Sequence, residues 1–308
     1  MSDLLENKNK FLQYELWKDC CIGCKFCCNK GQPDLNKIES LQFILNKLDD
    51  KEVYDYNEIG FIGGEFFNRE IEDDEVRRLF YKMFEKLTKF THIEKIYFTT
   101  ALIYDCDKLL IPFLNYLREI GILNKCLLCT SYDIAYRFYT EERKNLWKTN
   151  VLKIHDLYPE LKIHTEIIVT QHFINAVLNN EFSITNFKKE FDTHVDYIEP
   201  GSGLFYIDKK ECEQDIPGFF PTKDSFVKFL VKTIIENKEI DPYTFCSMEL
   251  RSSKLYYIDG GKRMVADERR NTNGVAKPLD KTKKYEIGLI DSDKTMRSIC
   301  QEFIKFHD

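Results

Sequence analysis

Five cysteines within nine residues form the part of the chain with the most obvious chemistry, Cys20-Cys21-Ile22-Gly23-Cys24-Lys25-Phe26-Cys27-Cys28. Adjacent cysteines such as Cys20 and Cys21 point apart, so thiols this close cannot all pair as disulfides without severe strain. A soft metal centre, in contrast, accepts several thiolates from one loop. The stretch therefore predicts a metal-binding loop.

The spacing of three of these thiols suits an iron–sulfur cluster. Cys20, Cys24 and Cys27 form the pattern C-x3-C-x2-C. Gly23 eases the turn before the second thiol, and Phe26 directly precedes the third. Three thiolates can hold three irons of a [4Fe–4S] cube and leave the fourth iron without a protein ligand, whereas a structural cluster or a zinc site normally recruits a fourth ligand. Such an open iron is a place where a substrate or cofactor can bind.

The two extra thiols leave the ligand set open. Cys21, Cys24 and Cys27 would give C-x2-C-x2-C, and Cys28 could compete with Cys27. We take Cys20, Cys24 and Cys27 as the ligands. We expect Cys21 and Cys28 to be small buried side chains beside the cluster.

A second motif follows an apolar run at 58–62 and reads Gly63-Gly64-Glu65. Glycines let the backbone approach a ligand closely, and a carboxylate pairs with an ammonium group. On its own the tripeptide would be weak evidence, because most such sequences are ordinary turns. Its weight comes from its place after the second predicted strand, with the thiol loop after the first.

These two motifs resemble those of the radical S-adenosylmethionine (SAM) superfamily. The signature of that family is C-x3-C-x-aromatic-C on the loop after the first strand of a (β/α)6 partial TIM barrel. Gly63-Gly64-Glu65 is similar to the family's motif after the second strand, where backbone and carboxylate meet the amino group of the methionine moiety. Phe66 stands where many relatives have proline.

The resemblance also implies the remaining cofactor contacts. Phe26 matches the aromatic position of the signature. A polar residue at the end of the fourth strand commonly meets the ribose or carboxylate of SAM, and Ser131 is the matching candidate, with Thr99 as another. Either hydroxyl could instead satisfy a local backbone group.

The chemistry implied by the resemblance is reductive cleavage of SAM. The reduced cluster passes one electron to the sulfonium, methionine leaves, and the 5′-deoxyadenosyl radical abstracts hydrogen from a substrate. An electron donor such as flavodoxin or ferredoxin would reduce the cluster, and the enzyme would be an oxidoreductase or transferase. A peptide or protein side chain is favoured as substrate, with a nucleotide or small metabolite as the alternative. The hypothesis from another class is a noncatalytic module that holds zinc or a redox-sensing iron–sulfur cluster.

The elements that must position these residues follow from apolar periodicity. It predicts strands at 11–17, 58–62, 94–99, 125–131, 161–170 and 195–199, and helices at 36–48, from 73 or 74, at 107–120, at 140–156 and within 171–191. Alternating strands and helices predict an α/β fold with a parallel sheet, and the resemblance adds the six-stranded partial barrel. In parallel α/β barrels, the chemistry gathers at the carboxyl ends of the strands.

We expect residues 1–205 to form this core and residues 206–308 to form a C-terminal α+β extension that covers the barrel opening. Within the extension, the sequence predicts a helix from Thr222 or Asp224 to 235, a hairpin at 254–266 with an Asp-Gly turn, and a last helix near 293–306. Three further cysteines in this part, Cys212, Cys246 and Cys300, are widely separated, so we expect one cluster.

Composition limits the partners. The chain has 45 basic and 51 acidic residues and a net charge of −6, which gives nucleic acid no support as a partner. Its 11 cysteines are odd in number, and residues 1–10 are polar and lack the apolar core of a signal peptide, which favours a reducing cytoplasm. No stretch approaches the roughly 20 apolar residues of a membrane span, so we expect a soluble protein with no membrane partner.

Overall fold

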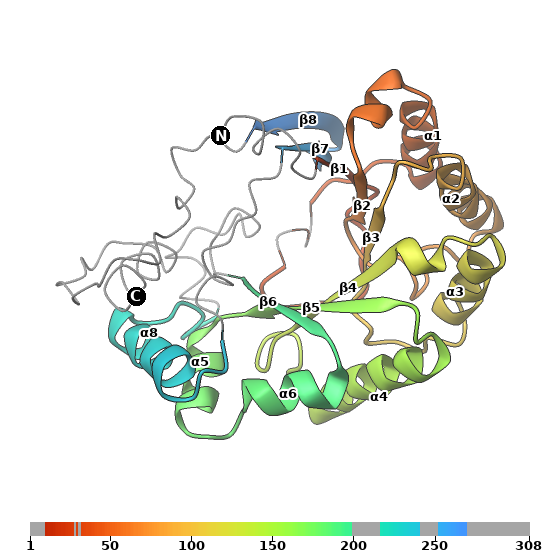
Figure 1. The fold of residues 1–308 in the computed structure, drawn as a ribbon. Coiled ribbons are helices and arrows are strands. Elements are labelled where there is room, and N and C mark those ends of the chain that lie inside the picture. Colours follow the sequence, from red (N-terminus) through yellow and green to blue (C-terminus); the bar gives the residue numbers. More distant parts are fainter. Residues whose placement is uncertain (1–9, 28, 30–31, 199–215, 241–251, 270–308) are drawn as a thin grey trace, which may run out of the picture. The chain divides into compact units, whose positions relative to one another are not determined.

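The computed structural model describes residues 10–27, 29, 32–198, 216–240 and 252–269. These residues form an α/β fold in which eight strands make one mostly parallel sheet, accompanied by seven α-helices (Figure 1). They divide into two compact units. The first holds the described residues up to 130, 140–164 and 252–269, and the second holds 131–139, 165–198 and 216–240.

Strands and helices alternate along the first unit. Its elements are β1 (Lys10–Glu15), α1 (Lys37–Lys47), the 3-10 helix η1 (Lys51–Asp55), β2 (Glu58–Ile62), α2 (Asp74–Leu87), β3 (Lys95–Thr99), α3 (Leu110–Glu119), the 3-10 helix η2 (Leu123–Lys125), β4 (Cys126–Tyr132, of which the last two residues belong to the second unit) and α4 (Glu141–Leu157). The strand pairs β1–β2, β2–β3 and β3–β4 are all parallel. The carboxyl ends of β1, β2 and β3, and the loops that leave them, therefore lie at one edge of the sheet.

Helix starts follow the capping residues that the sequence offers. Asn36, Asp73 and Thr140 each accept hydrogen bonds from backbone N–H groups in the first turns of α1, α2 and α4. Pro112 lies in the first turn of α3, where its missing N–H has no intrahelical partner to lose. The helix expected from 107 begins at Leu110 instead.

An aromatic core joins the strands to the helices in the first unit. Phe84 of α2 packs on Phe61 of β2, with ring centroids 5.1 Å apart, and on Phe113 of α3 at 4.8 Å. Phe98 of β3 lies 5.7 Å from Phe113. All four side chains are fully buried. Tilted and edge-on aromatic pairs of this kind contribute about 1 kcal/mol each beyond the area that they bury.

The second unit contains β5 (Lys162–Ile168, of which the first three residues belong to the first unit), α5 (Gln171–Leu178), α6 (Ile184–Phe191), β6 (His194–Ile198) and α8 (Lys223–Leu230), which continues as the π-helical turn η3 (Val231–Glu236). The helical stretch expected within 171–191 is divided into α5 and α6, and Asn180 between them has φ of +61°. Phe173 of α5 packs on Phe229 of α8 at 5.8 Å. Thr222, one of the two predicted starts, caps α8.

A hairpin of β7 (Ser252–Asp259) and β8 (Lys262–Arg269) belongs to the first unit. Its turn residues Gly260 and Gly261 have φ of +54° and +72°, as a two-residue turn with both residues left-handed requires. β7 pairs in parallel with β1, and the strand order of the sheet is β6-β5-β4-β3-β2-β1-β7-β8. Of the extension expected at 206–308, the hairpin thus contributes two strands beside β1.

The expected α/β class is confirmed by this arrangement. The helix expected near 293–306 lies outside the described residues. Of the helices that the structure describes, none is long and apolar enough to cross a membrane.

Candidate metal centre

The cysteine loop begins where the chain leaves β1, and it stays bound to the chain that leaves β2. The backbone N–H of Leu16 donates to the carbonyl of Ile62 at 2.9 Å, and the N–H of Gly64 donates to the carbonyl of Trp17 at 2.8 Å. The strand expected at 11–17 therefore ends earlier, at Glu15, because Leu16 and Trp17 already belong to this connection. The two sequence motifs meet at adjacent strand ends.

Gly63 and Gly64 are required by the close approach of the cysteine loop. A Cβ added to Gly64 would lie 1.8 Å from the carbonyl oxygen of Asp19, and one added to Gly63 would lie 2.3 Å from that of Trp17. Gly63 also has φ of +142°, which side chains disfavour. The sequence suggested glycines that admit a ligand. In the structure their immediate neighbour is the backbone that leads into Cys20.

An acidic side chain anchors the entry of the loop. Asp34 Oδ2 accepts from the backbone N–H groups of Lys18 and Asp19, at 2.8 and 2.7 Å. On the far side of Cys20, Arg143 of α4 donates from Nη2 to the carbonyl of Ile22 at 2.9 Å. Neither contact was foreseen from the sequence, because both join residues that are distant along the chain. Together they fix the backbone before and after the first thiol.

The three expected ligands lie in one loop, and a turn joins two of them, Cys24 and Cys27. Cys24 is buried, whereas Cys20 and Cys27 are half-buried. The N–H of Cys27 donates to the carbonyl of Cys24 at 3.2 Å, and Gly23 takes φ of +70° with open space around it. The predicted role of Gly23 in the turn is confirmed.

Desolvation by burial raises the pKa of the Cys20 thiol to about 12, and the nearby charges of Glu65 and Cys27 add to this effect. Hydrogen bonds from the backbone N–H groups of Ile22 and Glu65 act in the opposite direction and favour the thiolate. Without a cation the thiol therefore stays protonated near neutral pH. A bound metal supplies the charge that the thiolate needs.

Cys21 differs from these three thiols in its partners. Asn68 Nδ2 donates to Cys21 Sγ, and the charge of Glu70 adds to the burial that raises the pKa of Cys21. Cys21 is half-buried rather than buried, and its neighbours are the polar residues that follow Gly63-Gly64-Glu65. Cys28 lies outside the described residues.

The carboxylate of Glu65 is bound by donors of the protein itself. Oε1 accepts from the N–H groups of Phe66 and Phe67 at 2.9 and 3.0 Å. Oε2 accepts from the N–H of Ala101 at 2.6 Å, and the hydroxyl of Thr100 lies 2.9 and 3.1 Å from the two oxygens. Glu65 is 2% exposed, and burial raises its pKa.

Thr100, rather than the predicted Thr99, contacts the Glu65 carboxylate. Thr99 is the last residue of β3 and is half-buried. Thr100 shares the strand face of Ile96 and Phe98, both buried, and side-chain alternation could have indicated this from the sequence.

Phe26 and Ser131 are the remaining residues that the sequence predicts for the site. Phe26 is buried, with 4% of its surface exposed. Ser131 belongs to the second unit, where it is half-buried in β4 and its carbonyl accepts from Arg137 Nη1 at 3.5 Å. The structure thus brings together Cys20, Gly63, Gly64 and Glu65.

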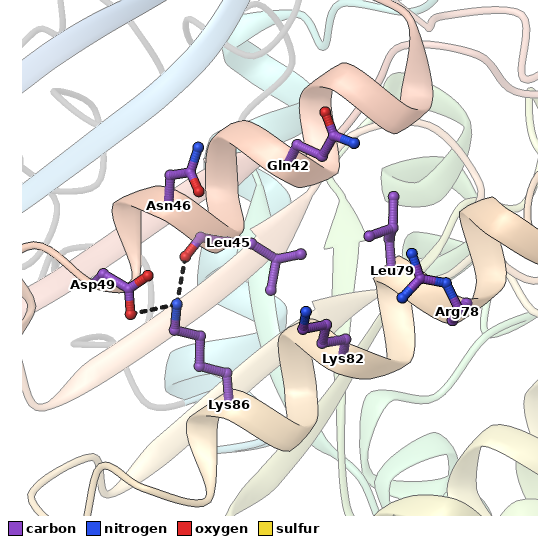
Figure 2. A pocket seen from close by; sticks show the side chains of 8 residues that line it. All are labelled: Gln42, Leu45, Asn46, Asp49, Arg78, Leu79, Lys82 and Lys86. Atoms are coloured by element: carbon purple, nitrogen blue, oxygen red, sulfur yellow. Dashed lines mark hydrogen bonds and ion pairs between the residues drawn. The ribbon is translucent and has the colours of Figure 1, made fainter.

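A groove between α1 and α2 is separate from the candidate metal centre (Figure 2). It encloses about 330 Å³ and is lined by Gln42, Leu45, Asn46, Asp49, Arg78, Leu79, Lys82 and Lys86. Figure 2 shows Lys86 reaching across it from α2 to the carbonyl of Leu45, at 2.7 Å, and to Asp49, at 2.5 Å. Its lining contains no thiol and none of the expected site residues.

A scan of the chain against protein-family models gives no match, and a search of the curated proteins also gives none.

Proposed function

We propose that this chain is a radical SAM enzyme whose cluster is held by Cys20, Cys24 and Cys27. The observation that carries the proposal is the contact between the two motifs. Gly64 has no space for a side chain because Asp19, the residue before Cys20, lies against it. A thiol loop and a Gly-Gly-Glu turn that meet at the ends of adjacent parallel strands are the arrangement that the family resemblance calls for.

The donor set fits an iron–sulfur cluster. The three thiols come from one loop with the spacing C-x3-C-x2-C, and the backbone N–H groups of Ile22 and Glu65 lower the pKa of Cys20 and so favour its thiolate. Hydrogen bonds to a ligand sulfur stabilise the charge that it carries. When bound, the cluster supplies the single electron that cleaves SAM reductively.

The residues of the chain bind and shield this centre. Cys20, Cys24 and Cys27 hold the irons, and the backbone of Gly63-Gly64 keeps the second strand end against the loop. Buried Phe26 and Cys24 exclude water from the inner side of the loop. Exclusion of water protects a reactive intermediate from side reactions.

In the proposed enzyme, β1 to β6 form the (β/α)6 partial barrel, and residues of the 206–308 extension cover its opening. Phe26, Glu65, Thr99 and Ser131 contribute to the SAM site. Reducing equivalents come from a small donor protein such as flavodoxin or ferredoxin, and the hydrogen is taken from a peptide or protein side chain.

Formation of 5′-deoxyadenosine tests the proposal. Protein prepared without oxygen and reconstituted with iron and sulfide is reduced with dithionite and given SAM. We expect 5′-deoxyadenosine and methionine in equal amounts, and neither product from the Cys24→Ala variant under the same conditions. Protein that binds zinc in place of iron, or iron-loaded protein that leaves SAM intact, would overturn the proposal.

A further inference from the structure

Arg143 reaches the cysteine loop from the first turn of α4, 121 residues further along the chain. Its Nη2 donates to the carbonyl of Ile22 at 2.9 Å. Ile22 is 3% exposed and lies midway between Cys20 and Cys24, two of the three expected ligands. This hydrogen bond therefore acts on the part of the loop that joins the first two thiols.

The helix that carries Arg143 is itself anchored in the core of the first unit. Trp147 and Asn150 follow Arg143 by four and seven residues, so the three side chains lie on one face of α4. Trp147 is fully buried, and its Nε1 donates to the hydroxyl of Thr130 at 3.0 Å. Asn150 Nδ2 donates to two carbonyls of the loop after β3, at 3.0 and 2.8 Å. Because its helix is held firmly, Arg143 can fix the position of the loop.

The same contact keeps a positive charge beside the loop. Arg143 is half-buried, and an arginine side chain in a protein is always charged. Two residues span at most about 7 Å of chain, so the guanidinium lies within roughly 13 Å of the backbone of Cys20 and of Cys24. In a partly buried site, one charge at this distance changes a one-electron equilibrium by about tenfold.

We propose that Arg143 is a positioning residue for the cluster, which holds the loop between Cys20 and Cys24 in place and keeps a positive charge beside it. The inference rests on the proposed function, in which both cysteines are ligands. A cluster gains one negative charge when it is reduced, and a fixed positive charge nearby favours that state. Arg143 therefore makes the proposed cluster easier to reduce.

The hold on the loop is tested in the metal-free protein, by the rate at which iodoacetamide labels each thiol, followed by mass spectrometry. Cys24 is the reporter, because it is buried and two residues from Ile22. In Arg143→Met we expect Cys24 to be labelled about fivefold faster, since a local opening of the loop no longer breaks a hydrogen bond. Cys126 of β4, which is 2% exposed, is the internal reference, and its labelling rate should stay unchanged.

The charge is tested by the midpoint potential of the reconstituted cluster, measured by anaerobic redox titration. We expect Arg143→Met to shift the potential to a value more negative by about 59 mV, which is a tenfold change for one electron. Arg143→Lys keeps the charge and a hydrogen-bond donor, so it should retain the potential and the labelling rate of the unmodified protein. If Arg143→Met does not fold, Arg143→Gln takes its place, because it removes the charge and keeps a polar side chain, and the same two shifts are expected.

The matched control is Arg118→Met at the opposite end of α4. Arg118 Nη2 donates to the carbonyl of Leu157, the last residue of the helix, at 2.8 Å. Leu157 is fourteen residues from Arg143, about 21 Å along the helix axis, which exceeds the screening length of about 10 Å at 0.1 M salt. This control should change neither the potential nor the labelling of Cys24.

The two measurements keep this inference separate from the proposed function. An unchanged labelling rate of Cys24 in Arg143→Met, or an equal rise at Cys126 that reports a general loss of stability, would overturn the inference. An unchanged potential would overturn it as well. Faster labelling of Cys24 alone, in a protein that never takes up a cluster, would support the hold on the loop and contradict the proposed function alone.

Discussion

Among the single residues, Gly64 and Cys20 show how tightly the site is built. Gly64 lies against the carbonyl of Asp19, and the next residue in that segment is Cys20, the first expected ligand. A side chain at Gly64 would push away the backbone that leads to the first thiol. Substitutions here therefore report on the metal site as well as on stability.

Gly64→Ala should lower the free energy of unfolding by at least about 3 kcal/mol, because a backbone carbonyl cannot move aside cheaply. It should also lower the iron content of the reconstituted protein. Gly121→Ala is the control, since Gly121 has φ of +77° but nothing within 4 Å of an added Cβ. Backbone strain alone should cost the control about 1–2 kcal/mol. Urea denaturation measures the free energy of unfolding of both variants. Equal losses of stability would show that the contact between Gly64 and the Asp19 carbonyl adds nothing to the backbone strain.

Cys24→Ala should abolish the proposed cluster, because it removes one of the three proposed ligands from a buried position. Cys21→Ala should leave iron and sulfide at the level of the unmodified protein, because Asn68 and Glu70 are the partners of Cys21. Iron and sulfide analysis of the two variants after anaerobic reconstitution checks both expectations. Full iron in the first variant, or total loss in the second, would contradict the ligand assignment.

Among the helices and strands, the β7–β8 hairpin has a structural role that the sequence did not indicate. Arg263 of β8 donates to the carbonyl of Glu15 and to the hydroxyl of Ser40, which itself donates to the carbonyl of Leu16. The carboxylate of Glu15 accepts from the N–H of Ile258 in β7 at 2.6 Å. A hairpin from the far end of the chain thus holds the end of β1, where the cysteine loop begins.

Arg263→Met should therefore cost about 2–3 kcal/mol of stability, because it leaves buried acceptors without their donor. Iron retention should fall as well, since the end of β1 loses an anchor. Met264→Ala on the same strand is the control, because Met264 is 43% exposed and its change should stay within about 0.5 kcal/mol. Similar unfolding curves for the two variants would argue against the anchor.

At the scale of the whole molecule, the sequence predicts the strand bounds, helix starts and motifs that depend on residues close together in the chain. The bounds of β2 agree with the apolar run at 58–62, and Asn36, Asp73 and Thr140 mark their helix starts by their type. The cysteine loop stands out by residue type and spacing alone. These features need no knowledge of distant neighbours.

Long-range contacts account for what the sequence did not predict. Its alternation predicted a hairpin near 254–266, but nothing local indicates that β7 pairs with β1. In the same way, nothing near Glu65 indicates that Thr100 and Ala101 would take its carboxylate. The apolar residues Leu16 and Trp17 extended the predicted first strand, although they serve the packing of the loop against Gly63 and Gly64.

The most direct test of the account is electron paramagnetic resonance of the reduced, anaerobically prepared protein before and after addition of SAM. We expect the signal of a reduced [4Fe–4S] cluster that changes when SAM is added, because in the proposed enzyme one iron has no protein ligand and takes the cofactor. A preparation without any cluster, or a cluster signal that SAM leaves unchanged, would contradict the account.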